Sequence, residues 1–305
     1  MFLKSTIGIL HPGQMGERLA KSLLQSGNSV LWCSSSRSQA TRDRATKLGL
    51  IEVDSFESFL ARCEGLISIC PPSEAVAVAK SVGGYKGFYC EANAISPMTA
   101  TSIMSIIKNN GGKYVDGSVI SFAGLRLYLS GPHAEEFRDK FYCKEVQSGD
   151  LKELKVIVMN SKSPVAASSL KAVYSGWDKA LSAHTINIHA LAMECDVHNE
   201  LLEECKISQP SFIQRSEEVL PTIPGKAWRF IGEMQEDMKL CKLHNLPHNF
   251  HSAAVEVFER LDEHKNKPTG SVSLSQMLDS LKYRSLSNSS NHSNGKSSSK
   301  NNNQW

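Results

Sequence analysis

Residues 5–16 read Ser-Thr-Ile-Gly-Ile-Leu-His-Pro-Gly-Gln-Met-Gly, and this stretch decides the fold of the chain. A short apolar run at 7–10 is followed at once by glycines, and a helix-period run then begins with Met15, Leu19 and Leu23. Because these three residues are spaced by four, they lie on one face of a helix. The stretch therefore predicts a strand, a tight turn and a helix in succession.

A strand, a glycine turn and a helix open a dinucleotide-binding βαβ unit. Gly13 would let the backbone approach a pyrophosphate, and Gly16 would let the helix pack closely on the sheet. His11 replaces the first glycine of the usual G-x-G-x-x-G pattern, which is costly if its φ must be positive. The cofactor contacts expected from this turn are His11, Pro12, Gly13, Gln14, Met15 and Gly16. The alternative is an ordinary strand-to-helix turn.

The end of the next predicted strand, 30–33, distinguishes NAD from NADP. An NAD site usually places an acid there to hold the ribose 2′-hydroxyl. This chain has Ser-Ser-Ser-Arg-Ser at 34–38 and no acid, which suits a 2′-phosphate. We therefore expect NADP as the cofactor, held by Ser35, Ser36 and Arg37. Ser36 or Ser38 could also simply cap the predicted helix 39–48.

Strands and helices continue to alternate through the first half of the chain. Strands are predicted at 51–53, 66–70, 88–91, 114–119, 125–129 and 154–159, and helices at 54–63, 73–82 and 96–108. Such alternation is typical of an α/β fold with a doubly wound parallel sheet. Ligands of these folds bind at the carboxyl ends of strands, where Cys70, Pro71 and Pro72 stand.

The second half of the chain is predicted to be helical. Long helical stretches cover 163–197, 227–243 and 250–263, and no strand pattern follows residue 160. We expect a Rossmann-type domain at 1–161, an all-helical domain at 162–285 and a disordered tail at 286–305. The tail holds seven Ser and six Asn among 20 residues, a composition that cannot build a core.

Composition excludes several classes of function. The net charge of +3 is too small for a nucleic-acid footprint, and no apolar run reaches the length of a membrane span. A secretory signal is not apparent, and the eight cysteines lack ligand-pair spacing, so we expect reduced thiols, no metal site and a cytoplasmic protein.

The predicted helix from 163 carries the candidate catalytic group. Lys171, Ser175 and Asp178 are spaced i, i+4 and i+7, which puts all three on one helix face. Small residues precede the lysine and would permit close approach to the other domain. Lys171 could serve as a general base in an interdomain cleft, or the face could be a solvated Lys–Asp surface.

Several stretches taken together resemble the 6-phosphogluconate dehydrogenase and β-hydroxyacid dehydrogenase superfamily. They are 7–16, 70–72, 91–97, 115–119, 167–171 and 228–234, which span most of residues 5–265. The second half is similar to the helical domain of the phosphogluconate dehydrogenase-like subgroup.

The resemblance implies roles for individual residues. The family's catalytic lysine falls on Lys171, its cofactor- and substrate-contacting Asn or Ser on Asn93, and its asparagine after the lysine on Ser175. Asp178 falls where 6-phosphogluconate dehydrogenase has an acid. Substrate contacts are also expected from Ser118 and Ser121, although both glycines of the family's Ser-Gly-Gly turn are missing near 120–122.

The activity that these expectations imply is NADP-dependent oxidation of a small β-hydroxy acid, or reduction of its keto form. Lys171 would act as general acid and base, and Asp178 could supply a proton if decarboxylation followed. The expected partners are a carboxylate-bearing small molecule and, from the resemblance, a second copy in a homodimer. The alternative is a redox-silent NADP-binding regulatory protein, because a retained fold does not guarantee chemistry. Imine reduction is a third, less favoured reading.

Overall fold

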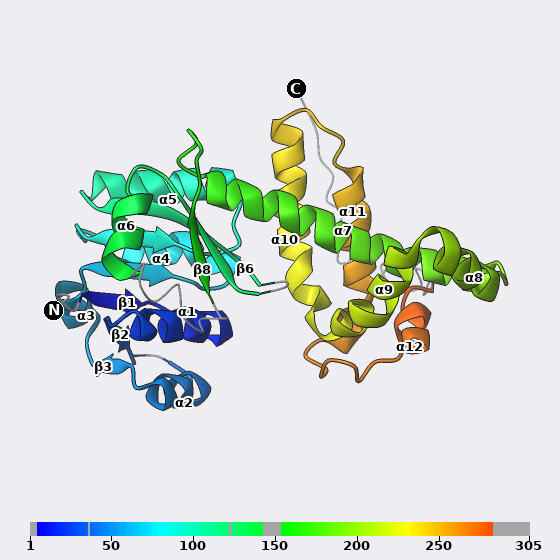
Figure 1. Ribbon diagram of the computed structural model, residues 1–305, viewed down its shortest axis with the longest axis horizontal. Helices are drawn as coiled ribbons and strands as arrows, with labels where there is room; N and C mark the ends of the chain where they lie inside the picture. The colour runs from blue at the N-terminus through cyan, green and yellow to red at the C-terminus, as the bar shows by residue number, and fades with distance from the viewer. Residues whose placement is uncertain (1–4, 36, 122–123, 143–153, 283–305) are drawn as a thin grey trace, which may run out of the picture.

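A computed structural model describes residues 5–35, 37–121, 124–142 and 154–282, and its two halves are joined by one long helix (Figure 1). The predicted tail at 286–305 lies outside the described residues, as do Ser36 and Phe122. The predicted boundary at 161–162 falls between the last strand of the sheet, which ends at Val158, and the long helix, which begins at Ala166.

The first half is an eight-stranded sheet with the order β3-β2-β1-β4-β5-β6-β7-β8. The strands are β1 Thr6–Ile9, β2 Ser29–Cys33, β3 Ile51–Val53, β4 Gly65–Ser68, β5 Phe88–Glu91, β6 Lys113–Ile120, β7 Arg126–Ser130 and β8 Lys155–Val158. The first six run parallel, with Gly8 beside Leu31 of β2 and Leu66 of β4. The strand order changes direction between β1 and β4, and this switch point is where such sheets bind ligands.

One part of the sheet differs from the predicted parallel arrangement. β7 pairs antiparallel with β6, with Ser118 opposite Tyr128, and β8 then runs parallel to β7. The physical reason is the short connection between Ile120 and Arg126, because a parallel return needs a crossover of a dozen or more residues.

Helices cover both faces of the sheet. They are α1 Gln14–Gln25, α2 Gln39–Leu48, α3 Phe56–Arg62, α4 Ala75–Ser81, α5 Pro97–Asn109 and α6 Ala134–Phe141. Leu19 and Leu23 of α1 pack with Phe137 of α6 on one face, whereas Phe59 of α3 and Ile103 of α5 belong to the core on the other. The doubly wound α/β class predicted from the sequence is therefore confirmed.

Local chemistry explains where these helices begin. Ser96 accepts a hydrogen bond from the backbone N–H of Thr99, and Pro97 is the first residue of α5, as predicted. The cap of α3 is Ser55 rather than the predicted Asp54, because the Ser55 side chain accepts from the N–H of Ser58. The shorter hydroxyl side chain one residue later is the group that reaches this donor.

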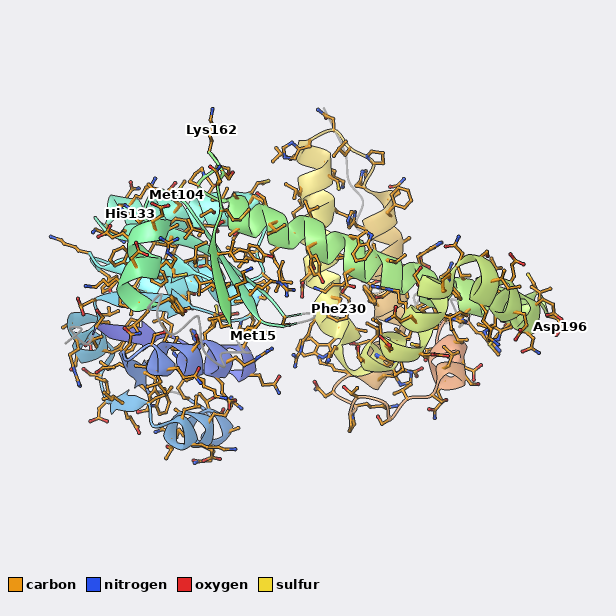
Figure 2. All side chains as sticks on the ribbon, viewed as in Figure 1. Met15, Met104, His133, Lys162, Asp196 and Phe230 are labelled. Atoms are coloured by element: carbon orange, nitrogen blue, oxygen red, sulfur yellow. The ribbon has the colours of Figure 1, made fainter. Side chains whose placement is uncertain are left out.

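The second half is helical in its described part. Its helices are α7 Ala166–Glu194, α8 His198–Ser208, α9 Pro210–Glu218, α10 Ala227–Leu243, α11 Asn249–Arg260 and α12 Leu274–Asp279. Figure 1 shows α7 leaving the sheet and running across α10 and α11. Asp196, just past its end, is far from the sheet, while Met15 and His133 lie in the sheet half (Figure 2). No described helix is both long and apolar enough to span a membrane.

Candidate active site

The predicted phosphate turn connects β1 to α1. Gly13 is the N-cap of α1, with φ −74° and ψ −172°, and a Cβ placed on it would meet nothing within 4 Å. A Cβ on Gly16 would lie 2.5 Å from the carbonyl oxygen of His11. The turn thus leaves open space at Gly13, where a ligand could approach the backbone, while Gly16 is needed for close packing of the helix on the turn.

His11 is accommodated without the strain that a missing glycine could cause. Among the described residues outside glycine, positive φ occurs only at Asp196, Asn245 and Asn266. His11 is half-buried, and its carbonyl accepts a hydrogen bond from the N–H of Gly13 at 2.8 Å. The tight turn therefore forms with ordinary backbone angles at this position. Of the other predicted turn residues, Pro12 is buried, Gln14 is exposed and Met15 packs against the sheet core.

The segment after β2 brings arginines to the same edge of the sheet. Arg37 is half-buried, and its Nε is buried without a hydrogen-bond partner. Arg44 of α2 donates from Nε to the carbonyl oxygen of Pro12 at 3.2 Å. Ser35 is exposed, and Ser38 is the residue that caps α2, accepting from the N–H of Thr41 at 3.4 Å. Sequence reasoning singled out Arg37 but missed Arg44, which lies one turn along the next helix.

Asn93 connects the ends of β4 and β5 by hydrogen bonds. It is buried, its Oδ1 accepts a hydrogen bond from the N–H of Cys70, and its Nδ2 donates to Ser68 Oγ at 3.1 Å. Its own N–H donates to Glu91 Oε1 at 2.9 Å. The Asn93 side chain is therefore buried and already hydrogen-bonded, and its contacts with cofactor and substrate stay a prediction. Pro71 and Pro72, which follow β4, are exposed.

Asp116 fastens the start of α7 to the sheet. Its buried carboxylate accepts from the N–H of Ser168 at 2.9 Å, from Ser168 Oγ at 2.6 Å and from Ser130 Oγ at 3.0 Å. Burial raises the pKa of this carboxyl, and the three donors oppose that shift. The anchored turn lies just before Lys171, so Asp116 fixes where that lysine stands. The sequence analysis assigned Asp116 no such role.

Lys171 lies in a small cleft formed by three separate segments. The cleft is lined by Ala94, Ile95 and Ser96 after β5, by Lys171, Ala172 and Ser175 of α7, and by Glu233, Glu236 and Asp237 of α10. Burial lowers the pKa of Lys171, nearby Lys179 lowers it further, and Glu233 opposes the shift. Within the described part of the chain, Lys171 forms no ion pair. This environment favours the neutral form of Lys171 more than water does, which suits a group that accepts and returns a proton.

The other two residues of the predicted helix face are engaged elsewhere. Ser175 Oγ donates to Glu233 Oε2 at 2.9 Å and accepts from Lys179 Nζ at 2.8 Å, and Lys179 also pairs with Glu233. Asp178 forms an ion pair with Arg215 of α9 at 2.5 Å. The role of Asp178 as a proton donor stays a prediction: its carboxylate is paired with Arg215, and its charge still acts on Lys171 by opposing the fall in the pKa of that lysine.

Asp237 is a buried acid of the cleft that the sequence analysis did not single out. Its side chain is 5% exposed, and its Oδ2 has no hydrogen-bond partner among the described residues. Burial raises its pKa to about 7, against the opposing charge of Lys179. The spacing of Glu233, Glu236 and Asp237, at i, i+3 and i+4, is the sequence signal that could have revealed this acidic face.

The two remaining predicted substrate contacts lie on and after β6. Ser118 is fully buried and its Oγ has no partner in the described residues, and it shares a face of β6 with Asp116 two residues earlier. Ser121 is exposed at the end of the strand. The structure therefore brings Ser118 toward the α7 side of the sheet, and it leaves Ser121 at the surface.

The described residues contain no cluster of three metal-binding side chains.

Glu91 gives a testable pH dependence of stability. Burial raises its pKa to about 8, so the folded chain binds this proton more tightly than the unfolded chain does. Its contribution to stability is therefore complete below about pH 4.5 and is lost as the pH rises through about 8. We expect Glu91→Gln to remove most of this loss and to raise the free energy of unfolding at pH 8 by up to roughly 4 kcal/mol.

The measurement is urea denaturation of both proteins at pH 5, 6.5 and 8. Exposed Glu57 supplies the matched control, since Glu57→Gln should leave the wild-type slope unchanged. A smaller slope should persist in Glu91→Gln because the pKa of Asp237 is also raised, to about 7. Parallel curves for wild type and Glu91→Gln would contradict the burial of a protonated Glu91.

Comparison with known proteins gives matches in both halves of the chain. Residues 192–261 match a family model described as a domain of unknown function, DUF1932. An uncharacterized 28.5 kDa protein from Methanothermus fervidus is 29% identical over 202 residues, which cover 65% of this chain and 74% of that protein. These matches carry no activity with them.

Three solved structures have a similar arrangement. The conserved protein MTH1747, whose structure was reported to be similar to 3-hydroxyacid dehydrogenases, matches with a TM-score of 0.65 and 24% identity, over 85% of this chain and 97% of that one. The 3-hydroxyisobutyrate dehydrogenase of Mycobacterium tuberculosis matches with a TM-score of 0.69 and 13% identity, over 92% and 100%. Psf3, solved with NADP⁺, matches with a TM-score of 0.57 and 16% identity, over 90% and 99%.

These likenesses extend over nearly the whole of each solved chain, including both the sheet and the helical half. At the level of the fold the predicted resemblance is confirmed: the chain shares the fold of a 3-hydroxyisobutyrate dehydrogenase and of a protein reported to be similar to 3-hydroxyacid dehydrogenases.

Proposed function

We propose that the protein is an NADP-dependent oxidoreductase that interconverts a small β-hydroxy acid and its keto form, with Lys171 as general acid and base. The observation that carries the proposal is the position of Lys171. It lies in a cleft between the loop after β5 and α10, on a helix that Asp116 fastens to the sheet. Solved structures of the same fold include a 3-hydroxyisobutyrate dehydrogenase and a protein bound to NADP⁺, which supports this choice.

The residues at the switch point fit a dinucleotide. Open space at Gly13 and the N-terminus of α1 suit a pyrophosphate, and the unpartnered Nε of Arg37 is a donor that lacks an acceptor. Arg37 and Ser35 would hold a 2′-phosphate, and residues 11–16 the pyrophosphate. When bound there, NADP supplies the site with a hydride acceptor.

Proton transfer is the task of the chain's own residues. In the oxidation direction, neutral Lys171 would take the proton of the substrate hydroxyl on its Nζ, and it would return that proton in the reduction direction. Burial and the charge of Lys179 lower the pKa of Lys171, which favours the neutral form. Three carboxyl groups of α10 line one side of the cleft, so a substrate carboxylate is expected on the opposite side, toward Ser118 and Ser121.

A redox-silent NADP-binding protein is the second candidate. The hydroxyl of Ser175 is already bonded to Glu233 and Lys179, and the amide of Asn93 is bonded to the end of β4. Both groups would need to rearrange before they could bind substrate. On this reading the chain would bind the dinucleotide without oxidising any substrate.

Titration of the purified protein with NADPH and NADH, followed by nicotinamide fluorescence, tests the cofactor assignment first. We expect saturable NADPH binding and much weaker NADH binding, because the segment after β2 offers a guanidinium and no acid. A panel of β-hydroxy acids with NADP⁺, and of keto acids with NADPH, then tests the reaction. Binding without turnover on the whole panel supports the redox-silent candidate, and no binding of either dinucleotide contradicts both.

We further propose that the helical half forms a homodimer. A cavity of about 720 Å³ lies between α7, α10 and α11, and several of its lining side chains are exposed, including Trp177 at 61% and Phe250 at 74%. Large exposed apolar patches mark interaction surfaces. Trp177→Glu with Phe250→Glu should convert a dimer into monomers in sedimentation velocity, whereas Met98→Glu on α5 should not. A monomeric wild-type protein would contradict the proposal.

A further inference from the structure

His11 is held in a fixed place at the phosphate turn. Its carbonyl oxygen accepts from the N–H of Gly13, and it lies 2.5 Å from the point that a Cβ of Gly16 would occupy. The backbone of His11 is therefore fixed between β1 and α1. A dinucleotide bound at the switch point would have its pyrophosphate at this turn, so the imidazole would stand next to it.

Two nitrogen atoms at this edge of the sheet lack a partner. His11 Nδ1 and Arg37 Nε are both buried, and neither has a hydrogen-bond partner among the described residues. They come from the ends of two neighbouring strands, β1 and β2. Buried polar atoms without partners are uncommon because leaving them unpaired is costly. Arg37 Nε is a donor, and His11 Nδ1 is a donor when the imidazole is protonated, so the pair fits an acceptor that the described residues do not supply.

Burial, helped by the charge of Arg37, keeps the imidazole of His11 neutral when no anion is present. Burial lowers the pKa of its imidazole to about 4, and Arg37 contributes to the same shift. The other charged groups at the turn are Arg44 of α2, which donates to Pro12, and Glu17 in the first turn of α1. An incoming diphosphate would reverse the balance, since a negative charge close to a partly buried imidazole favours its protonated form.

We propose that His11 is a proton-accepting ligand of the dinucleotide: when the diphosphate occupies the turn, the imidazole takes up one proton from solvent and faces the phosphates as a cation. This inference rests on the proposed function, because it requires a dinucleotide at the turn. A glycine in the same place could not take up a proton. Cofactor affinity in this chain should therefore fall as the pH rises, in a way that a glycine turn would not produce.

Calorimetry of NADPH binding measures the proton directly. Titrations at pH 6 in two buffers that differ in ionisation enthalpy give the number of protons taken up for each NADPH bound. We expect wild type to take up roughly one proton more than His11→Gln. The dissociation constant of wild type, relative to that of the variant, should rise by up to about tenfold per pH unit between pH 5.5 and 7. Exposed His244 supplies the control, and His244→Gln should behave as wild type.

The phosphate of NADPH itself titrates near pH 6, and comparing proteins at one pH removes that contribution. Equal proton uptake by wild type and His11→Gln overturns the inference and leaves the proposed function standing. No binding of NADPH to either protein overturns both. If His11→Gln does not fold, the imidazole of His11 in ¹³C-histidine-labelled wild type is titrated by NMR with and without NADPH. An unchanged pKa on saturation also overturns the inference.

Discussion

Replacing Lys171 with methionine should remove most of the turnover and leave NADPH binding almost intact. Methionine keeps the unbranched side-chain shape but cannot carry a proton, so the loss should appear in the chemical step. Loss of a general base typically costs about 10²- to 10⁴-fold in rate, and we expect kcat/KM to fall within that range. The measurement is steady-state kinetics with whichever hydroxy or keto acid the substrate panel identifies, together with a fluorescence titration of NADPH.

The matched control for this prediction is Lys162→Met. Lys162 is exposed just before α7, and its side chain points away from the molecule (Figure 2). This variant should retain wild-type kinetics. In the oxidation direction, wild-type kcat/KM should fall toward low pH as Lys171 becomes protonated, with its midpoint below the ordinary lysine range because burial lowers the pKa. Comparable turnover in Lys171→Met would contradict the acid–base role.

The same substitution at two glycines three residues apart should affect different properties: cofactor binding at Gly13 and stability at Gly16. Gly13→Ala places a methyl group in open space and in a backbone conformation that alanine can adopt, so the free energy of unfolding should change by less than about 1 kcal/mol. The same methyl group lies where a pyrophosphate would approach the backbone. We expect the dissociation constant for NADPH to rise at least about tenfold, which corresponds to roughly 1.4 kcal/mol.

Gly16→Ala should instead destabilise the fold. Its new Cβ would meet the His11 carbonyl oxygen at 2.5 Å, and that backbone is held by the turn, so the helix must shift. Overpacking of this kind costs roughly 1–3 kcal/mol. Urea denaturation and NADPH titration of both variants separate the two effects. A Gly13→Ala protein that binds NADPH as wild type does would show that the dinucleotide does not approach this turn.

Much of the sheet half follows from local sequence. The run of apolar residues ending at Leu10, the glycines at 13 and 16, and the Ser-Pro pair before α5 predict their elements because propensity, capping and period agree at each place. The antiparallel β7 was not predicted, since a strand's direction depends on the length of its connection rather than on its own residues. The short helices α8 and α9 were also missed, although the first long helix was expected to end near 197 and Pro210 is the first residue of α9.

The candidate site divides in the same way. Lys171 could be selected from its helix and from the family resemblance, and Arg37 from the absence of an acid after β2. Asp237 and Arg44 were not selected, because their positions beside Lys171 and Pro12 arise from contacts between elements far apart in the chain. Asp178 was selected by helical spacing and by the family resemblance, and its ion pair with Arg215 of α9 is visible only in the tertiary structure.

By itself, the sequence determined the alternation of strands and helices from β1 to α5, the glycine turn, and a lysine near the start of the long helix α7. These features depend on residues within a few positions of one another, where backbone sterics and capping act. The tertiary structure alone decided which acid approaches Lys171, that Asp116 holds the start of α7, and that His11 and Arg37 share one edge of the sheet. Burial and charge act through space, so shifted pKa values and buried atoms without partners arise only once distant segments have packed.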